Sequence, residues 1–587
     1  MESEDEQTVR ALSWRGMCIG AVGSAVITAS SLYVALKLGA LPWPIVFAAL
    51  ISYFFLRLLG RGKCPTSLNE ANVTHTAMSA GAMVAGGLAF TIPGYWILGG
   101  QDAVAFWQVL LVALAGVTLG LVATACLRRY FIDEARLPFP IGVSAAETLK
   151  ASAEVQAQES KALFGSMGLA AIYALLRDNL ALLPQMLLTG VRIPGVAFGI
   201  YNSPMLLAVG FIIGPVACLV WFIGALIGDF GVVVGGTAVG AWSLETAASI
   251  KTSLGMGLMF GAGLGVVLLQ LVPMLRRRWQ RGGADEPSPV SHSVSRSASQ
   301  PVFRSPRTTV LVAAIGSAAT AALAATALGL GLVASVLLVV GVWIAVLISS
   351  QSVGVTGIDP MEVFGVLVVL VIMVFCHELS LLSLFMIAAV VAVAAGLTGD
   401  VMNDFKAGAI LGTNPREQWI AQAIGGVIGA LVASIILLAL ATVFGTEAFG
   451  SNVDGSPREF VAAQASVVAA MVGGIPHVPA FAIGLAAGLL LTLLRLPVLT
   501  LGLGVYLPFY LSLTAFLGAL VKLVCDLLAR RAKPRPAPRQ VPEPQTATSQ
   551  ATEPERFGVA VAAGLLGGES LVGVISALIV MAVALLA

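Results

Sequence analysis

The feature that most constrains this chain is its series of long apolar stretches that carry few charges. A transmembrane helix needs about 20 consecutive apolar residues, and about 17 stretches of the chain approach that length. With 58% hydrophobic and 11% charged residues, the composition lies far from that of soluble domains. Strands of a membrane β-barrel would be short with alternating polarity, and the sequence shows no such alternation. The sequence therefore predicts an all-α integral membrane protein, a polytopic helical bundle of about 16 spans.

Two hydrophilic segments divide these apolar stretches. Residues 276–308 are rich in Ser, Pro and Arg, a composition typical of a disordered linker. This linker would separate an N-terminal transmembrane half, residues 1–275, from a C-terminal half, residues 309–587. A second hydrophilic loop covers residues 529–556. We predict two halves of about eight spans each, related as parallel repeats and containing broken or re-entrant helices.

Arginines beside the spans predict the orientation of the chain. Both hydrophilic segments begin with arginine clusters, whereas the loops at 99–106 and 445–455 contain neither Lys nor Arg. Positively charged loops stay in the cytoplasm, so the N-terminus and the linker are predicted to be cytoplasmic. We expect a multi-pass protein of the cell (inner) membrane.

Several kinds of chemistry are excluded by missing motifs. No GxxxxGK[ST] occurs, so the chain carries no P-loop of its own, and a net charge of +2 does not favour nucleic acid. The stretch CHELS (376–380) begins like a zinc protease motif, but position 381 is Leu. The glycine-rich stretch 255–265 lies within an apolar run and predicts close helix packing, not phosphate binding. No metal or cofactor is expected, and two classes remain: a gradient-driven transporter or channel, or an intramembrane enzyme acting on a lipid-linked substrate.

Polar residues at membrane depth are the candidates for function, because each ionisable group there costs about 2.5–3.5 kcal/mol or more. In the stretch 68–87, one polar stripe is predicted from the helical spacing of Asn69, Asn72, His75 (with Thr76) and Ser79. Glu70 would lie near the positive end of the same helix. A helix cap at Asn69 is the structural alternative for the start of this stripe.

A second candidate region is 135–152, where two prolines and Gly142 interrupt the backbone before Glu147 and Lys150. A cytoplasmic loop leading into an amphipathic helix would explain these residues. A short re-entrant helix whose N-terminal amides face a cavity would explain them equally well, because irregular backbone at membrane depth is tolerated only there.

The segment 398–418 is the most polar of these regions. We predict a short helix that ends at glycines, a break, and a second helix that begins at Pro415 with Thr413 or Asn414 as its cap. The segment is expected to pack inside the bundle against residues 137–151, with its charges facing a polar cavity and each other instead of lipid. Its candidate residues are Asp400, Asn403, Asp404, Lys406 and Gln418.

The last candidate is Glu569, which follows two glycines near the middle of the final apolar run. A lone carboxylate at this depth is either protonated or paired. As a paired group it would have a structural role, and as a protonated group it could carry a coupling proton. Both readings stay open.

Five stretches, in chain order, resemble the conserved elements of the oligopeptide transporter family, which also contains the yellow-stripe-like metal-chelate transporters. The chain resembles a bacterial member of that family over residues 14–575. The stretches are NEANVTHTAMSAGAMVAGGLAFTIPG (69–94), LPFPIGVSAAETLKA (137–151), GDVMNDFKAGAILGTNPREQ (399–418), LGLGVYLPFYLSLTAFLGALV (501–521) and ERFGVAVAAGLLGGESLVGV (555–574).

The resemblance implies proton-driven uptake of oligopeptides or of small peptide-like metal chelates. Such substrates are zwitterionic, and charges of both signs would be supplied by Lys406 with Asp400, Asp404 and Glu147. Five positions depart from the family pattern within the candidate sites: His75, Ala82, Ile141, Asn403 and Ala407. His75 and Asn403 each stand where Gln is usual. These departures do not change the expected fold, but they affect which substrate the site is expected to bind.

Overall fold

The structure is a computed structural model of the chain. It describes residues 11–586 except 40, 42–44, 61–66, 101–102, 155, 189, 192, 281–301, 304, 327, 451–457 and 533–552. The described residues are almost entirely helical. Two short strands, β1 (Met186–Leu187) and β2 (Ile200–Tyr201), pair antiparallel, with Met186 opposite Tyr201.

The helices up to residue 280 include three that continue as π-helical turns: η1 (Arg129–Glu134), η2 (Leu175–Asn179) and η3 (Leu226–Gly235). The α-helices in this part are α1 (Trp14–Leu38), α2 (Ile45–Gly60), α3 (Leu68–Ala89), α4 (Pro93–Ile97), α5 (Phe106–Arg128), α6 (Pro140–Glu154), α7 (Gln156–Ala174), α8 (Pro204–Ile213), α9 (Pro215–Ala225), α10 (Gly236–Ala238) and α11 (Leu244–Gln280).

The helices from residue 306 onward are α12 (Pro306–Thr326), α13 (Gly331–Thr356), α14 (Met361–Phe375), α15 (Leu381–Leu411), α16 (Pro415–Phe444), the 3-10 turn η4 (Thr446–Ala448), α17 (Ala463–Gly473), α18 (Val478–Leu493), α19 (Val498–Tyr506), α20 (Phe509–Ala532) and α21 (Glu553–Leu586).

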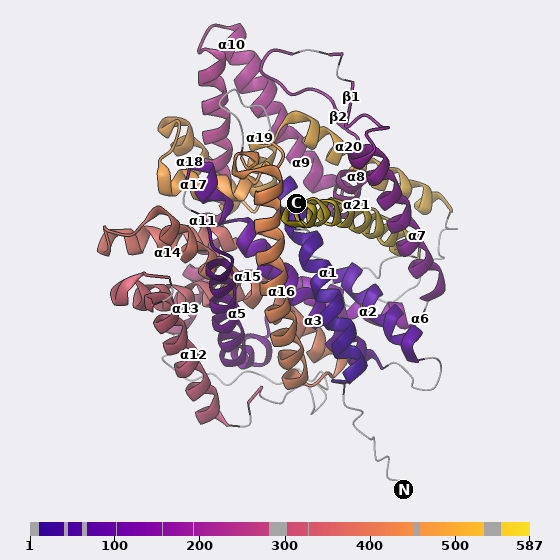
Figure 1. Ribbon diagram of the computed structural model, residues 1–587, viewed down its shortest axis with the longest axis vertical. Helices are drawn as coiled ribbons and strands as arrows, with labels where there is room; N and C mark the ends of the chain where they lie inside the picture. Colours follow the sequence, from indigo (N-terminus) through magenta and orange to yellow (C-terminus); the bar gives the residue numbers. More distant parts are fainter. Residues whose placement is uncertain are drawn as a thin grey trace.

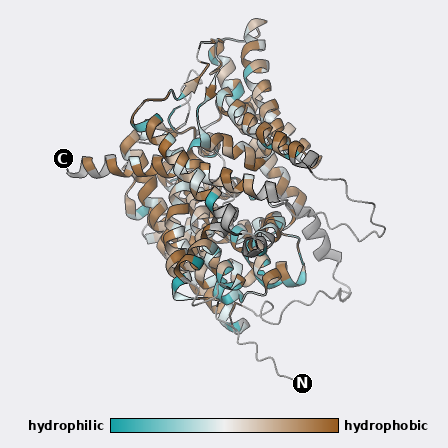
Figure 2. Ribbon diagram, turned by 90° about the vertical axis from the view of Figure 1, so that its right-hand side faces the viewer, coloured by the Kyte–Doolittle hydropathy of each residue, from teal (hydrophilic) through white to brown (hydrophobic). Residues whose placement is uncertain are grey.

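In the described part of the chain, ten helical stretches are long and apolar enough to cross a membrane, and four shorter apolar helices accompany them. Hydrophobic residues dominate the bundle, and many hydrophilic ones lie at its lower end in Figure 2. The predicted all-α polytopic membrane fold is confirmed. The predicted number of spans, about 16, exceeds the ten long apolar stretches because some predicted runs are short or divided by breaks.

The predicted broken helices are present, and two of them lie side by side. Gly214, with φ 91°, separates α8 from α9, and Pro508 precedes α20 after the end of α19. Glycines allow the two broken helices to approach closely. A Cβ added to Gly210 of α8 would meet the carbonyl oxygen of Ala515 in α20, and one added to Gly504 of α19 would meet that of Trp221 in α9.

The glycine-rich stretch 255–265 also packs helix against helix, as predicted. A Cβ added to Gly257 or Gly261 of α11 would meet carbonyl oxygens of α18. Small residues therefore bring these two backbones together, which is their common use in membrane helices.

The centre of the bundle is formed by α3 and α15 (Figure 1). The most apolar windows of their spans, 68–97 and 381–411, are 100% and 83% buried. These two helices carry most of the polar candidates predicted from the sequence, so those side chains lie inside the protein and away from lipid.

The prediction of a short helix at 398–411 is wrong, since these residues are the last turns of the continuous helix α15. The glycines in this region do not break the helix because each makes room for a neighbour: Gly399 for Asp359, and Gly408 for Gln418. The break occurs at Gly412, with φ 81°. The predicted second helix is confirmed, with Asn414 as its N-cap and Pro415 as its first residue.

The two hydrophilic segments lie partly outside the described residues. Within 276–308, helix α11 continues to Gln280 and α12 begins at Pro306; within 529–556, helix is described to Ala532 and again from Glu553. The division into two halves and the cytoplasmic placement of the N-terminus remain predictions.

Candidate transport site

The polar stripe of α3 faces the junction between α15 and α16. The N-cap of α3 is Ser67, whose hydroxyl accepts a hydrogen bond from the backbone N–H of Glu70, so Asn69 is not the cap. Asn69 instead accepts a hydrogen bond from Thr413 (2.8 Å), and Thr413 accepts one from the Nδ2 of Asn72 (3.0 Å). The stripe thus holds the break between α15 and α16 against α3.

Glu70 belongs to a separate ion pair at the start of the same helix. Its Oε1 accepts from the Nε of Arg15 (2.7 Å), and its Oε2 lies 2.5 Å from the Nη2 of Arg15. The hydroxyl of Ser13 also donates to Glu70. Glu70 lies in the first turn of α3, where a negative charge is favourable. Its contacts join the start of α1 to the start of α3, which is a structural role.

Two buried carboxyl groups of α15 form the centre of the site. The hydroxyl of Ser79 lies 2.8 Å from the Oδ2 of Asp400 and 3.1 Å from the Oδ2 of Asp404. The Nε2 of Gln422 donates to the same oxygen of Asp404 (2.9 Å). Both carboxyl groups are enclosed, with exposures of 1% and 2%. We call Asp400 and Asp404 the acidic pair.

The Nδ1 of His75 is 3.8 Å from the Oδ1 of Asp404, beyond hydrogen-bond distance. Neither ring nitrogen of His75 has a hydrogen-bond partner among the described residues, and the side chain is fully buried. The Oδ1 of Asn72 and the Oε1 atoms of Gln418 and Gln422 are also unpaired within that part of the structure. Such groups each cost about 1–3 kcal/mol when left unsatisfied. The surroundings of the acidic pair can therefore accept additional protons or polar groups.

Gln418 joins this cluster through the backbone. Its Nε2 donates to the backbone carbonyl oxygen of Asp404 (2.8 Å). Two residues of α16, Gln418 and Gln422, therefore bind the backbone and the side chain of Asp404. Asn403 and Lys406 lie on another side of α15 and contact the segment 137–151, as predicted.

The contacts with 137–151 are made by backbone groups at the start of α6. Gly142 donates its N–H to the Oδ1 of Asn403 (3.1 Å), and Lys406 donates to the carbonyl oxygen of Leu137 (3.0 Å). A side chain at position 142 would collide with the backbone of Asn403. Lys406 is therefore not paired with Asp404. Lys150 lies on α6 and is half-buried, and the side chain of Glu147 lies outside the described residues.

Glu569 lies in a different network, in which it is fully paired. Its Oε1 accepts from the Nη2 of Arg177 (2.8 Å) and the hydroxyl of Ser203 (2.7 Å), and its Oε2 accepts from the N–H of Met205 (2.8 Å). Arg177 also forms two hydrogen bonds with Asp178. Of the two readings left open by the sequence, these contacts favour the structural pair.

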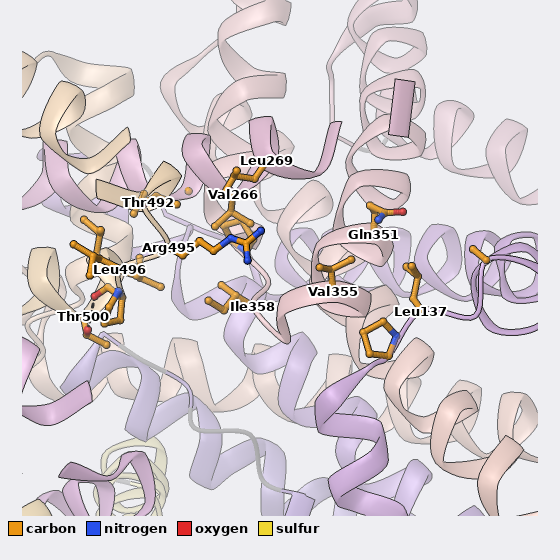
Figure 3. Close-up of a pocket in the computed structure, with 18 of the residues that line it drawn as sticks. Leu137, Val266, Leu269, Gln351, Val355, Ile358, Thr492, Arg495, Leu496 and Thr500 are labelled. Atoms are coloured by element: carbon orange, nitrogen blue, oxygen red, sulfur yellow. Dashed lines mark hydrogen bonds between the residues drawn. The ribbon is translucent and has the colours of Figure 1, made fainter. Parts of the chain in front are cut away.

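A large cavity lies beside the contact between α15 and the start of α6 (Figure 3). Its volume is about 1020 Å³, and its lining includes Leu137, whose carbonyl oxygen binds Lys406. Among the described residues, two cations, Arg136 and Arg495, and no acidic side chain line it. We call it the arginine cavity. Its further lining residues are Tyr130, Ala135, Pro138, Ala262, Gly263, Val266, Leu269, Gln351, Val355, Ile358, Pro360, Thr492, Leu496, Pro497, Val498, Leu499 and Thr500.

The acidic pair does not line the arginine cavity. The prediction was that the charges of 398–418 face a polar cavity and each other. Asp400 and Asp404 share contacts with Ser79, which fits the second part, and their contacts do not place them at the arginine cavity. Among the described residues, no group of three or more His, Cys, Asp and Glu side chains is positioned to hold a metal ion.

Comparison with known proteins decides the family. The family model described as OPT oligopeptide transporter protein matches residues 11–580. The chain belongs to the OPT family of oligopeptide transporters. A Haemophilus influenzae protein named "Putative oligopeptide transporter" is 27% identical to this OPT protein over 621 residues, covering 94% of this chain and 93% of that protein.

The family assignment confirms the resemblance seen in the sequence. In this OPT protein, the first three of the five stretches meet in space: α3, the segment 137–151 and the end of α15 contact one another. Ser79 and Gln422 are also part of the centre: Ser79 belongs to the polar stripe predicted on α3, and Gln422 follows Gln418 at i, i+4. Their helical spacing from His75 and Gln418 is the signal that identifies them.

Proposed function

We propose that this protein is a secondary active transporter that couples proton movement to the uptake of oligopeptides or small peptide-like metal chelates. The observation that carries the proposal is the acidic pair, which is enclosed between α3, α15 and α16 and has no Lys or Arg partner among the described residues. The name of the related Haemophilus protein supports peptides as the substrate class.

The acidic pair is suited to hold and release one proton. Ser79 has a single hydroxyl hydrogen, so it can donate to only one of the two carboxyl oxygens that it contacts. Two ionised carboxylates in this enclosed position would repel each other strongly, and one shared proton removes that repulsion. His75, with two unpaired nitrogens 3.8 Å or more from Asp404, offers an additional place for a proton.

Protonation of Asp404 is linked to the position of α16. Gln418 and Gln422 of α16 bind the backbone and the side chain of Asp404, and Thr413, in the break before α16, is held by α3. A change of charge at Asp404 alters these hydrogen bonds. The proton can therefore bias the packing of α16 against α15, which is the kind of bistable contact that alternating access requires.

We propose that the substrate binds in the arginine cavity. Peptides and amino-acid-derived chelates carry carboxylates, and guanidinium groups bind carboxylates through two parallel hydrogen bonds. Arg495 extends into the cavity between Val266 and Ile358 (Figure 3). Lys406 donates one hydrogen to Leu137 at the cavity wall, and we propose that its remaining donors serve a substrate carboxylate.

The test is uptake into proteoliposomes with a labelled panel of di- to tetrapeptides and metal chelates. Uptake should rise with an inward proton gradient and collapse with a protonophore. The exposed carboxylate variant Glu447→Gln serves as a control for the loss of one negative charge. Sodium-dependent uptake that is indifferent to pH would contradict the coupling, and failure of every peptide and chelate would contradict the substrate class.

A further inference from the structure

A second cavity, of about 540 Å³, is lined by none of the residues that line the arginine cavity. It is lined by Lys37 near the end of α1, by Phe444 at the end of α16, and by Glu459 beyond it. The start of α16 lies near the end of α5, since Trp419 donates to the carbonyl oxygen of Leu121.

We propose that this second cavity is a recognition site for the zwitterionic ends of a short peptide. The proposal deepens the proposed function and rests on it. If the N-terminal end of the bundle is cytoplasmic, as the arginine pattern predicts, this cavity faces the side from which a peptide is taken up. We call it the tyrosine cavity.

The charges that line the tyrosine cavity have both signs. Lys37 and Arg458 are its cations, and Asp178 and Glu459 are its anions. The ammonium of Lys37 is hydrogen-bonded to Glu459 and lies above the rings of Tyr33 and Phe460, at 5.8 and 5.4 Å from their centroids. The Lys37 side chain is only 13% exposed, so a carboxylate that reached it would be partly shielded from water. Charged hydrogen bonds are stronger in such places.

Three tyrosines give the cavity its aromatic character. Tyr33, Tyr201 and Tyr510 all line it, and the rings of Tyr201 and Tyr510 are 5.9 Å apart. None of their phenol hydroxyls has a hydrogen-bond partner among the described residues. Phenol groups can donate to a carboxylate or accept from an ammonium, and their rings pack against side chains of varied shape. A peptide, with two charged ends and variable side chains, fits this combination.

The residues that are hydrogen-bonded to Glu569 lie directly behind the charged and aromatic lining of the tyrosine cavity. Arg177 binds Asp178 and Glu569 and lies 5.3 Å from the ring centroid of Tyr201. The backbone N–H of Met205, another lining residue, donates to Glu569. Glu569 is therefore a positioning residue that fixes Asp178 and Tyr201 at the cavity without touching the substrate.

The arginine cavity provides a contrast in charge. Among the described residues, its lining has cations and no acid, so these residues can bind a carboxylate but offer no partner for a peptide ammonium. The tyrosine cavity offers both partners. We therefore expect the requirement for a free peptide N-terminus to arise at the tyrosine cavity.

The experiment measures binding of labelled trialanine to the purified full-length protein in detergent, with no gradient. N-acetylated and C-amidated trialanine are the two comparison ligands. We expect Lys37→Gln to weaken binding of trialanine by about ten-fold and to leave the C-amidated peptide unaffected, since loss of one charge-assisted hydrogen bond has about this effect. Tyr510→Phe, which keeps the ring, should weaken trialanine binding by about three-fold, and the exposed-lysine control Lys161→Gln should have no effect.

The possible results distinguish a failure of the tyrosine cavity as the recognition site from a failure of the proposed transport function. If wild-type protein takes up trialanine in proteoliposomes but Lys37→Gln and Tyr510→Phe bind it with wild-type affinity, the tyrosine cavity is not the recognition site and the proposed function stands. Equal binding of trialanine and both blocked peptides by the wild type would also overturn the site. If the wild type neither binds nor transports any peptide, both proposals are wrong.

Discussion

The acidic pair and Glu569 are both carboxyl groups buried in long helices close to glycines, yet their surroundings differ. Glu569 accepts three hydrogen bonds, one of them from the guanidinium of Arg177. The acidic pair has no such cation among the described residues, and its two carboxyl groups share the hydroxyl of Ser79. Glu569 therefore has a charged partner, whereas the described donors to the acidic pair are the hydroxyl of Ser79 and the amide of Gln422.

This difference shows that burial alone does not identify a proton carrier. A buried carboxylate with a full set of donors has little reason to change its protonation state, and breaking such a pair mainly costs stability. A buried pair with too few donors has two states of similar cost, with and without a shared proton. The predictions below test whether this division of roles is correct.

The largest effect is expected for Asp404→Asn. This change keeps the shape of the side chain and removes the shared proton. Uptake of labelled peptide driven by an inward proton gradient should fall by about 100-fold, which corresponds to about 2.8 kcal/mol. Peptide exchange without a gradient should persist, which separates coupling from binding. Full proton-driven uptake by this variant would remove the acidic pair from the mechanism.

Glu569→Gln should act on stability instead of coupling. The amide can replace one acceptor oxygen but leaves Arg177 without its charged partner on α21. We expect a loss of about 2–3 kcal/mol in the free energy of unfolding, read as a lower Tm, with an unchanged pH dependence of uptake per folded molecule. An unchanged Tm together with lost pH dependence would reverse the comparison and make Glu569 the proton carrier.

Lys406→Ala should reduce uptake by about ten-fold, or about 1.4 kcal/mol, while Tm changes little. The variant loses one described hydrogen bond, to the carbonyl oxygen of Leu137, and the proposed contact with a substrate carboxylate. Lys161→Ala, at an exposed position, is the matched control. Wild-type uptake by the Lys406 variant would show that this lysine only anchors the start of α6.

The smallest effect is expected for His75→Gln. A Gln amide can donate to Asp404, and Gln is the usual residue at this position of the family motif. We expect stability to change by no more than about 1 kcal/mol and proton-driven uptake to stay within about three-fold of wild type. Loss of proton-driven uptake would make His75 an obligatory proton acceptor, so the acidic pair alone would not account for coupling.

The acidic pair and its neighbours could be predicted from the sequence because they are local. Asn72 and His75 recur at helical spacing on one helix, as do Asp400 and Asp404 on another, and polar groups at such depth must face protein. The packing of 398–418 against 137–151 is confirmed by the contacts of Asn403 and Lys406. The continuity of α15 was not predicted, because glycines that break a helix and glycines that make room for a neighbour look alike in sequence.

The tyrosine cavity could not be predicted in this way. Tyr33, Lys37, Tyr201, Glu459 and Tyr510 come from segments far apart in the chain, and each is unremarkable beside its own neighbours. The pairing of Glu569 could not be predicted for the same reason, since its partners Arg177 and Ser203 are more than 360 residues away in the chain.

Hydrophobicity, helical spacing and missing motifs were enough to determine an all-α membrane protein with polar groups on α3 and α15. These properties depend on the bilayer as solvent and on the 3.6-residue period of the helix, which act on each segment by itself. The tertiary structure decided which buried carboxyl groups are paired and where cavities form. Pairing and cavity shape depend on which distant side chains meet, and in a helical bundle that is set by close packing among helices, not by any one of them.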